Sequence, residues 1–407
     1  MTTTREGPRP LPLHLTAAAA ISANSSAAWI HLRNGWIPWS KDLAEAGREL
    51  ENDLAKIDPL TFGLALLAEL TESHAQFLSG LEAYRAHPYR RTLIPPPPLW
   101  EMDGIELLDY GASAQAPPPQ RPVLVVPSLV NRSYIMDLME NGSFLRFLAS
   151  RGLRPLLIDW GDTGADRSER TLDWYIAEIL SKALGEATDV NNGNPVPVIG
   201  YCMGGTLAAA LTVLHPEQIS SLVLLATPWD FHCDHNGPHP GIAAARPGLE
   251  AMISSFGLLP VDALQSMFFS LDPLLGWRKF RAFSRLKPDS AKARAFVALE
   301  DWLNDGTPLT AAVARGCLFG WYLDNEPARG VWTVAGSEID ASAIRCPVLA
   351  AIPGKDRIVS PASARALIET IPDGEWISPD AGHIGMMVGG SAKKKLWEPV
   401  CEWLKTV

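Results

Sequence analysis

The chain has 407 residues, of which 47% are hydrophobic and 20% charged, a balance typical of a globular protein with a large core. Its formal net charge of −10 argues against a general nucleic-acid binder, and an anionic substrate would need a local cluster of Arg or Lys. The five cysteines are scattered without a C-x-x-C pair, and apolar residues never run together for 18 positions. We therefore expect a cytoplasmic protein without a disulfide framework, a nucleic-acid partner or a membrane span.

The N-terminal part of the chain reads as helical. Apolar residues recur at three- and four-residue spacing through much of 12–88, so we predict an N-terminal helical segment over 1–93. Two proline clusters, IPPPPLW (94–100) and APPPQRP (116–122), then bracket a short strand-like IELLDYG. This composition predicts a stiff Pro-rich connector over 94–121.

After the connector, buried strands alternate with amphipathic helices. The predicted strands are PVLVVP (122–127), RPLLIDW (154–160), VPVIG (196–200), SLVLLA (221–226), CPVLAAI (346–352) and the weaker EWIS (375–378), and the predicted helices are Ser133–Arg151, Thr171–Gly185, Thr206–Leu214 and Ala362–Ile371. Continuous apolar strands joined through helices indicate an α/β fold with a mainly parallel sheet covered on both faces. We assign 122–228 and 341–407 to this core.

One long interruption separates the fourth strand from the fifth. It contains helical stretches such as VDALQSMFFSL and DSAKARAFVALEDWL and no convincing apolar strand. We interpret 229–340 as an inserted helical cap.

The stretch PVPVIGYCMGGTLAAALTVL (195–214) predicts a strand, a sharp turn and a helix, with Cys202 at the apex between Gly200 and Gly204. This is the setting of a nucleophile elbow, in which strain and the helix N-terminus favour a reactive thiolate. The alternative is a structural cysteine packed beside a tight turn. The strand–turn–helix context favours the nucleophile.

A thiol nucleophile needs a base, and the base needs an orienting group, in the chain order nucleophile, acid, histidine. Asp356, in IPGKDRIVSP, follows a predicted strand, and His383 lies in the glycine-flanked SPDAGHIGMMVGG. Asp380 is a rival orienting acid that we interpret as a turn residue. For the oxyanion hole we predict the N–H of Met203 and a second N–H from the loop after the first core strand, with Val130 favoured over Asn131.

These residues resemble the polyhydroxyalkanoate synthases, cysteine-dependent members of the α/β-hydrolase superfamily. The resemblance runs from about Arg121 to Val407, outside much of the cap, and rests on VPSLVNRSYIMDL, LIDWGDTGADRSERTLDWYI, GYCMGGTLAA, IRCPVLAAIPGKDRIVSPASA and AGHIGMMVGGSAKKKLWEPVCEWL. The second and last blocks are most similar to the short, two-subunit type.

The resemblance implies that Cys202 is the nucleophile, Asp356 the acid and His383 the base in polymerising (R)-3-hydroxyacyl-CoA into polyester with release of CoA. It also implies an accessory subunit or a homodimer as partner, the storage granule surface as a location, and no metal or nicotinamide cofactor. Asn131 and Arg132 are candidate substrate-binding residues. Arg132 follows the oxyanion loop and has two open interpretations, a contact with a CoA phosphate or an ordinary surface salt bridge.

This chain departs from the family at two points. Arg357 stands where the family usually has His after the catalytic Asp, and the N-terminal helical segment is longer than in the two-subunit type. Two other functions remain open. One is a thioesterase or polyester hydrolase that uses the same triad with water as acceptor, and the other is a non-catalytic granule-associated protein.

The loop FHCDHNGPHP (231–240) gathers three His, one Cys and one Asp. These residue types suit zinc, but their spacing matches no known structural site. We interpret the loop as part of the cap without a metal.

Overall fold

The computed structural model describes residues 5–111, 120–162 and 169–407. The chain divides into two compact units. The first comprises the residues up to Arg90 together with Gln265–Asn304, and the second comprises Arg91–Leu264 and Asp305–Val407. Part of the expected cap, 265–304, is therefore grouped with the N-terminal helices.

The second unit is built on one sheet. Within the described residues it has eight strands in the order β1-β2-β6-β3-β7-β8-β13-β14. Their bounds are β1 Pro98–Met102, β2 Ile105–Asp109, β3 Arg121–Val126, β6 Leu153–Asp159, β7 Val196–Tyr201, β8 Ile219–Leu225, β13 Val348–Ala351 and β14 Glu375–Ile377. From β6 to β14 all neighbours are parallel.

The predicted core strands are confirmed. β3, β7, β8 and β13 are buried along nearly their whole length, which is why each reads as a continuous apolar run. Residues 112–119 of the stretch expected as a connector, 94–121, lie outside the described residues. The part before them contributes the antiparallel hairpin β1–β2, and β2 pairs antiparallel with β6. Asp103 and Gly104 form its turn with positive φ values of 54° and 71°, and Pro98 is tolerated because β1 is an edge strand.

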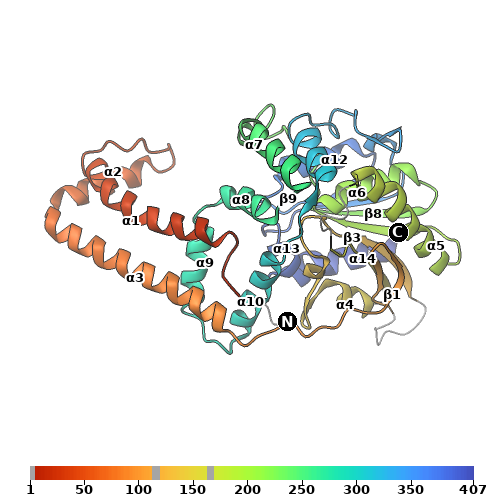
Figure 1. Ribbon diagram of the computed structural model, residues 1–407, viewed down its shortest axis with the longest axis horizontal. Coiled ribbons are helices and arrows are strands. Elements are labelled where there is room, and N and C mark those ends of the chain that lie inside the picture. Colours follow the sequence, from red (N-terminus) through yellow and green to blue (C-terminus); the bar gives the residue numbers. More distant parts are fainter. Residues whose placement is uncertain (1–4, 112–119, 163–168) are drawn as a thin grey trace. The chain divides into compact units, whose positions relative to one another are not determined.

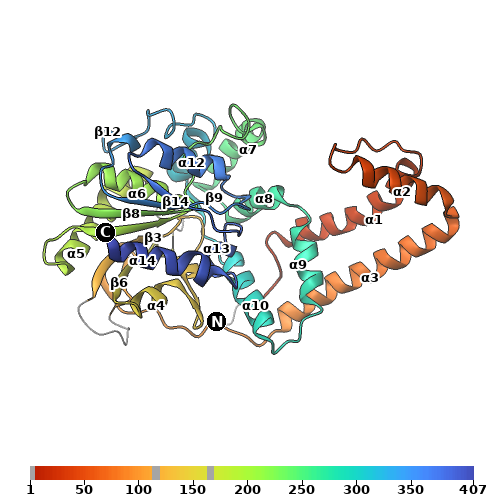
Figure 2. The ribbon, with the colours of Figure 1, turned by 180° about the vertical axis from the view of Figure 1, so that it is seen from behind.

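Helices cover both faces of the sheet. Figures 1 and 2 show α6 and α12 on one face and α4 and α14 on the other. The bounds are α4 Phe144–Ala149, η3 Trp174–Leu180, α5 Ser181–Val190, α6 Met203–Leu214, α12 Pro361–Thr370, α13 Gly385–Val388, η6 Lys393–Trp397 and α14 Glu398–Thr406. The parallel sheet with helices on both faces is the architecture predicted from the strand–helix alternation.

The helix predicted over Ser133–Arg151 is wrong. The structure has a 3-10 turn, η1 (Ser133–Met136), a short hairpin of β4 (Asp137–Met139) and β5 (Gly142–Ser143), and only then α4. Ser143 caps α4 by accepting the Arg146 N–H at 3.0 Å. Asp137 is fully buried and forms ion pairs with Arg91 and Arg146. These side-chain interactions stabilise the hairpin over the helix that the apolar spacing predicted.

The insertion between β8 and β13 is largely helical, and the helices predicted at 261–271 and 289–303 are confirmed. Its elements are α7 Pro240–Phe256, β9 Leu258–Leu259, α8 Val261–Leu271, α9 Leu275–Phe283, α10 Ala291–Asn304, β10 Leu309–Thr310, α11 Ala311–Arg315, η4 Gly316–Trp321, β11 Thr333–Val334, β12 Ser337–Glu338 and η5 Ala341–Ala343. β9 pairs antiparallel with β10, so the two ends of the segment between these strands lie side by side in the second unit.

The first unit is helical, as expected, and contains α1 (Leu11–Arg33), α2 (Ala44–Lys56), α3 (Pro59–Ala86), α9 and α10. Its core holds Phe77 and Tyr84 of α3 against Phe280 of α9. A Cβ on Gly80 would lie 2.0 Å from the Phe280 carbonyl oxygen, so the close approach of α3 and α9 requires glycine there.

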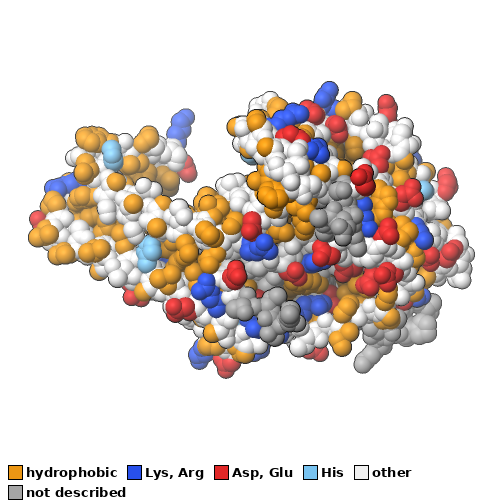
Figure 3. Space-filling model, in the orientation of Figure 1, with side chains coloured by type: hydrophobic (Ala, Val, Ile, Leu, Met, Phe, Trp, Pro, Cys, Tyr) orange, Lys and Arg blue, Asp and Glu red, His pale blue; other side chains and the backbone are white. Residues whose placement is uncertain are grey.

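Part of α3 leaves apolar side chains exposed. Leu60, Leu64 and Leu67 are 71%, 61% and 62% exposed and recur at helical spacing. Hydrophobic side chains are visible across this part of the first unit in Figure 3. Within the described residues, no helix has the length and hydropathy of a membrane span.

Candidate active site

Cys202 lies at the junction of β7 and α6. Its backbone adopts φ 54° and ψ −128°, a strained conformation for a residue other than glycine. The Cys202 N–H donates to the Leu225 carbonyl at 2.8 Å, and the Cys202 carbonyl accepts from the Gly205 N–H at 2.9 Å. Because the strained residue is held on both sides, the half-buried thiol is presented at the carboxyl edge of the sheet.

The glycines around Cys202 are required by close packing. A Cβ on Gly204 would lie 2.2 Å from the Val126 carbonyl oxygen, and one on Gly205 would lie 1.8 Å from Thr227 Oγ1. Gly200 faces α6 in the same way, since its Cβ would lie 2.4 Å from Gly205 Cα. The tight elbow inferred from the glycine pattern is therefore present, and it abuts the loop that follows β3.

His383 and Asp356 form a buried pair. Nδ1 of His383 lies 2.7 Å from Asp356 Oδ2, and both residues are 7% exposed. The other carboxylate oxygen, Oδ1, accepts the backbone N–H groups of Ile358 at 2.8 Å and Val359 at 3.0 Å. The carboxylate is thus fixed by its own loop, and it in turn fixes the imidazole.

The opposite side of the imidazole faces the thiol. Because Nδ1 is taken by Asp356, Nε2 is the ring nitrogen left for Cys202, which lies close enough to act on the pKa of His383. Burial lowers the pKa of His383, but the negative charge at Cys202 and the hydrogen bond to Asp356 outweigh it and raise the pKa to about 10. These influences favour the protonated form of the His383 imidazole.

Asp380 makes a different set of contacts. Its exposed carboxylate lies 2.7 Å from Lys355 Nζ and 3.6 Å from Lys395 Nζ. The Lys355 hydrogen bond lowers the pKa of Asp380. The loops that carry Asp356 and His383 are also joined by a backbone hydrogen bond from Lys355 to Ala381 at 3.0 Å. Asp380 therefore ties the two loops together at the surface, in keeping with its interpretation as a turn residue.

The predicted oxyanion donors lie on the two segments that meet at the elbow. Met203 is the first residue of α6 and is buried. The Val130 N–H donates to Ser128 Oγ at 3.2 Å, and the Val130 carbonyl accepts from the Thr307 N–H at 3.4 Å. The oxyanion roles of Met203 and Val130 remain predictions.

The two candidate substrate-binding residues follow in the same loop. Asn131 bridges to Gly306, and its Nδ2 is buried without a hydrogen-bond partner in the described part of the chain. Arg132 donates to the Gly161 carbonyl at 2.6 Å and lies 3.7 Å from Asp305. These contacts anchor the loop, and the roles of both residues in binding substrate remain predictions.

Two tyrosines near the nucleophile were not identified from the sequence. The ring of Tyr201 stacks on the His383 imidazole, with centroids 5.3 Å apart and planes inclined by 29°. Burial, followed by the negative charge of Cys202, raises the pKa of Tyr322, which comes from the insertion. Tyr201 is detectable in hindsight because it immediately precedes the nucleophile, whereas nothing in the sequence near Tyr322 marks it.

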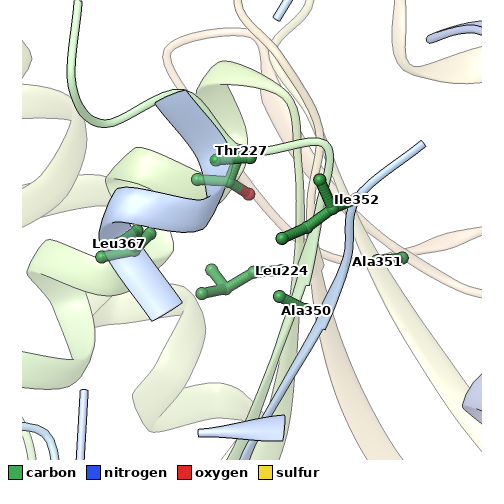
Figure 4. Close-up of a pocket in the computed structure, with 7 residues that line it drawn as sticks. Leu224, Thr227, Ala350, Ala351, Ile352 and Leu367 are labelled. Carbon is green, nitrogen blue, oxygen red and sulfur yellow. The ribbon is translucent and has the colours of Figure 1, made fainter. Parts of the chain in front are cut away.

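A small pocket lies between β8, β13 and α12 (Figure 4). Its lining is apolar apart from Thr227, and it includes none of Cys202, Asp356 and His383. In the loop at 231–240, His232 Nε2 hydrogen bonds to the Leu323 carbonyl and the Cys233 thiol donates to the Asp230 carbonyl. Within the described ranges, no three His, Cys, Asp or Glu side chains are grouped to hold a metal ion.

Comparison with known proteins shows the family to which the chain belongs. Residues 121–390 match the model of the alpha/beta hydrolase fold family. Poly(3-hydroxyalkanoate) polymerase subunit PhaC of Allochromatium vinosum is 30% identical, over 75% of this chain and 87% of that protein. The protein of the same name from Haloarcula marismortui is 30% identical over 75% of this chain and 66% of its own length.

The fold is also found among solved structures. A soluble variant of monoglyceride lipase from Saccharomyces cerevisiae aligns with a TM-score of 0.51 and 15% identity, over 79% of this chain and 98% of the lipase. This likeness concerns the fold alone. On the family match and the similarity to the A. vinosum protein, the chain belongs to the alpha/beta hydrolase fold family and, within it, to the poly(3-hydroxyalkanoate) polymerase subunit PhaC proteins.

Proposed function

We propose that this protein is a polyhydroxyalkanoate synthase, an acyltransferase that polymerises (R)-3-hydroxyacyl-CoA into polyester and releases CoA. The names of its relatives support the reaction, since they are called poly(3-hydroxyalkanoate) polymerases. The observation that supports the mechanism is the buried His383–Asp356 hydrogen bond beside Cys202, whose charge acts on the His383 ring.

In the first half-reaction the Cys202 thiolate attacks the thioester carbonyl carbon. The carbonyl oxygen becomes an oxyanion, which in our proposal is stabilised by the Met203 N–H and by the Val130 N–H, which exchanges its bond to Ser128 Oγ for one to the oxyanion. The carbon–sulfur bond to CoA then breaks, and the CoA thiolate takes the proton that His383 holds. The products are acyl-Cys202, free CoA and a neutral imidazole.

In the second half-reaction the neutral His383 accepts the proton of a 3-hydroxyl group, on a monomer or on the growing chain. The hydroxyl oxygen attacks the acyl-cysteine, and the Cys202 thiolate leaves. A new ester bond is formed, and the thiolate–imidazolium pair is restored. Asp356 orients the imidazole through both steps and does not need to take the proton itself.

The preference for a thiol follows from the bonds exchanged. Transfer from CoA to Cys202 replaces one thioester by another, so the acyl group stays activated toward a hydroxyl. A serine would form an oxygen ester at once, and passing the acyl group to a second hydroxyl would then be nearly thermoneutral. A cysteine therefore suits a polymerase better than a serine.

Both half-reactions use only protein side chains and backbone N–H groups. We therefore propose that no metal or organic cofactor takes part. Water must be kept from the acyl-cysteine, because it would otherwise compete with the hydroxyl acceptor. The insertion is suited to this task, since it carries Tyr322, whose pKa is raised by burial and then by the negative charge of the nearby Cys202.

The same triad with water as acceptor would make a thioesterase or polyester hydrolase. Incubating the purified protein with (R)-3-hydroxybutyryl-CoA distinguishes the synthase from the hydrolase. We expect release of CoA thiol together with insoluble polymer. Thiol release with only free 3-hydroxybutyrate would assign the hydrolase, and absence of thiol release would favour a non-catalytic granule-associated protein.

We further propose that the protein acts in the cytoplasm at the surface of polyester granules, together with an accessory subunit or as a homodimer. The word "subunit" in the names of the relatives supports a partner. The exposed apolar face of α3, at Leu60, Leu64 and Leu67, is a candidate surface in the first unit. Light scattering would establish whether the purified protein is a monomer. Full polymerase activity of such a monomer would show that no partner is needed.

A further inference from the structure

Tyr201 occupies a distinctive place beside the catalytic pair. It is the last residue of β7, it directly precedes Cys202, and it is 3% exposed. Its ring stacks on the His383 imidazole at a centroid distance of 5.3 Å, and its hydroxyl donates to the His383 carbonyl oxygen at 3.5 Å. One side chain therefore touches both the ring and the backbone of the base.

The pleat of β7 explains how Tyr201 reaches His383. Successive residues of a strand point to opposite faces, and Gly200 faces α6, since a Cβ there would meet Gly205. Tyr201 therefore points to the other face of the sheet, where the loop after β14 brings His383. The nucleophile and the residue that stacks on its base are consequently placed by one rigid strand end.

The charges that act on the imidazole come from two directions. Cys202 faces it from the elbow, and Asp356 faces it from the loop after β13. Lys355 and Asp380, in the same loops, are exposed and paired with each other. Burial and the negative charges of Cys202 and Asp356 raise the pKa of Tyr201, so its hydroxyl stays neutral and its ring adds no charge to the site.

We propose that Tyr201 is a positioning residue that holds the plane of the His383 ring and stabilises its protonated form through the aromatic face. An aromatic face attracts a cation that lies within about 6 Å of its centroid, and more strongly where water is excluded. The stacking favours imidazolium over neutral imidazole and so favours the thiolate at Cys202. The proposal rests on the Cys202–His383 pair of the proposed mechanism, but not on polymerisation.

The test measures the rate at which iodoacetamide alkylates Cys202 between pH 5 and 11. Mass spectrometry of the Cys202 peptide separates it from the other four cysteines. A thiolate–imidazolium pair gives two steps in this profile, one where the pair forms and one where the imidazolium loses its proton. The variants are Tyr201→Phe, which keeps the ring, and Tyr201→Leu and Tyr201→Met, which fill the space without an aromatic face.

For Tyr201→Leu or Tyr201→Met we expect the upper step to fall by about one pH unit and the lower step to rise. Tyr201→Phe is expected to keep both steps near their wild-type positions. Two aliphatic variants are made in case one of them does not fold. Thermal unfolding shows which variants are folded, and only these are compared. A folded aliphatic variant with an unchanged profile, or a Phe variant shifted as far as Leu, would overturn the inference.

The assay also separates this inference from the proposed function. A wild-type profile with a single step at the position of an ordinary thiol would refute the catalytic pair itself, and with it the role of Tyr201. Two wild-type steps that do not respond to loss of the ring would refute the role of Tyr201 alone.

Discussion

Asp356 holds His383 with one carboxylate oxygen while the other is occupied by its own loop. Oδ2 lies 2.7 Å from His383 Nδ1, and Oδ1 accepts the N–H groups of Ile358 and Val359. The two oxygens therefore have separate tasks. This division decides what an amide would do at the same position.

Asp356→Asn is expected to place its amide oxygen toward the two backbone N–H groups, which require an acceptor. Its NH₂ group would then face His383 Nδ1, so that the proton of the neutral ring moves to Nε2, which can no longer accept one from a thiol or hydroxyl. We expect the turnover rate to fall by about 10³- to 10⁴-fold, as when an aspartate of this kind is changed in serine proteases. CoA release from (R)-3-hydroxybutyryl-CoA measures the effect.

Asp380→Asn is the matched control for that variant. Asp380 lies three residues from His383, but its carboxylate is exposed and pairs with Lys355 and Lys395. Exposed ion pairs contribute about 0–1 kcal/mol to the free energy of unfolding, so the turnover rate should stay within a few-fold of wild type. Equal losses in both variants would contradict the assignment of Asp356 as the orienting acid.

Cys202→Ala should abolish polymer formation and CoA release together, because no other group can form the acyl-enzyme. The expected loss in turnover is at least about 10⁴-fold. Cys202→Ser should also be severely impaired, since His383 is tuned to a thiolate and the oxygen ester would no longer be activated. Electrospray mass spectrometry of both variants after incubation with substrate shows whether an acyl ester accumulates on the serine. Wild-type rates in the alanine variant would place the nucleophile elsewhere.

The titration of His383 should depend on the sulfur opposite it. The negative charge at Cys202 is the largest influence that raises the pKa of His383 to about 10, whereas burial acts in the opposite direction. Removing the charge in Cys202→Ala should therefore lower that pKa by about 1–3 pH units, so that the imidazolium loses its proton at lower pH. The measurement is NMR of ¹³C-labelled histidine, with the His383 signal assigned by its loss in His383→Gln. An unchanged titration would mean that the thiol does not face the ring.

The sequence predicted the parts of this structure that have strong local signals. The core strands were found because parallel strands buried on both faces are continuous apolar runs. Cys202 was found because its glycine pattern is needed for a tight strand-to-helix turn. The β1–β2 hairpin was read as a connector because an edge strand is half exposed and tolerates Pro98, so its apolar signal is weak.

Other features depend on contacts between segments that are distant in the sequence. The grouping of 265–304 with the N-terminal helices arises from packing such as Phe280 against Tyr84, which periodicity within either segment cannot reveal. Tyr201 stacks on His383, and these two residues are 182 positions apart in the sequence. Which of Asp356 and Asp380 hydrogen bonds to His383 is likewise visible only from where each carboxylate lies.

Gly204→Ala provides a test of the elbow that does not involve the reacting groups. The new Cβ would lie 2.2 Å from the Val126 carbonyl oxygen and 2.5 Å from that of Pro127. Since both obstacles are backbone atoms, either α6 or the loop after β3 must move. We expect a loss of about 1–3 kcal/mol in the free energy of unfolding, measured in urea, and a fall in turnover because the oxyanion donors of the two segments separate.

Gly185→Ala is the control for this variant, because Gly185 lies within α5 and a Cβ there meets no atom within 4 Å. Alanine is the better helix former by about 1 kcal/mol, so this variant should be as stable as wild type or more stable, with unchanged turnover. If Gly204→Ala behaved like Gly185→Ala in both measurements, the close approach of the elbow to the loop after β3 would be incorrect. The placement of Met203 and Val130 as partners in one oxyanion hole would then lose its structural support.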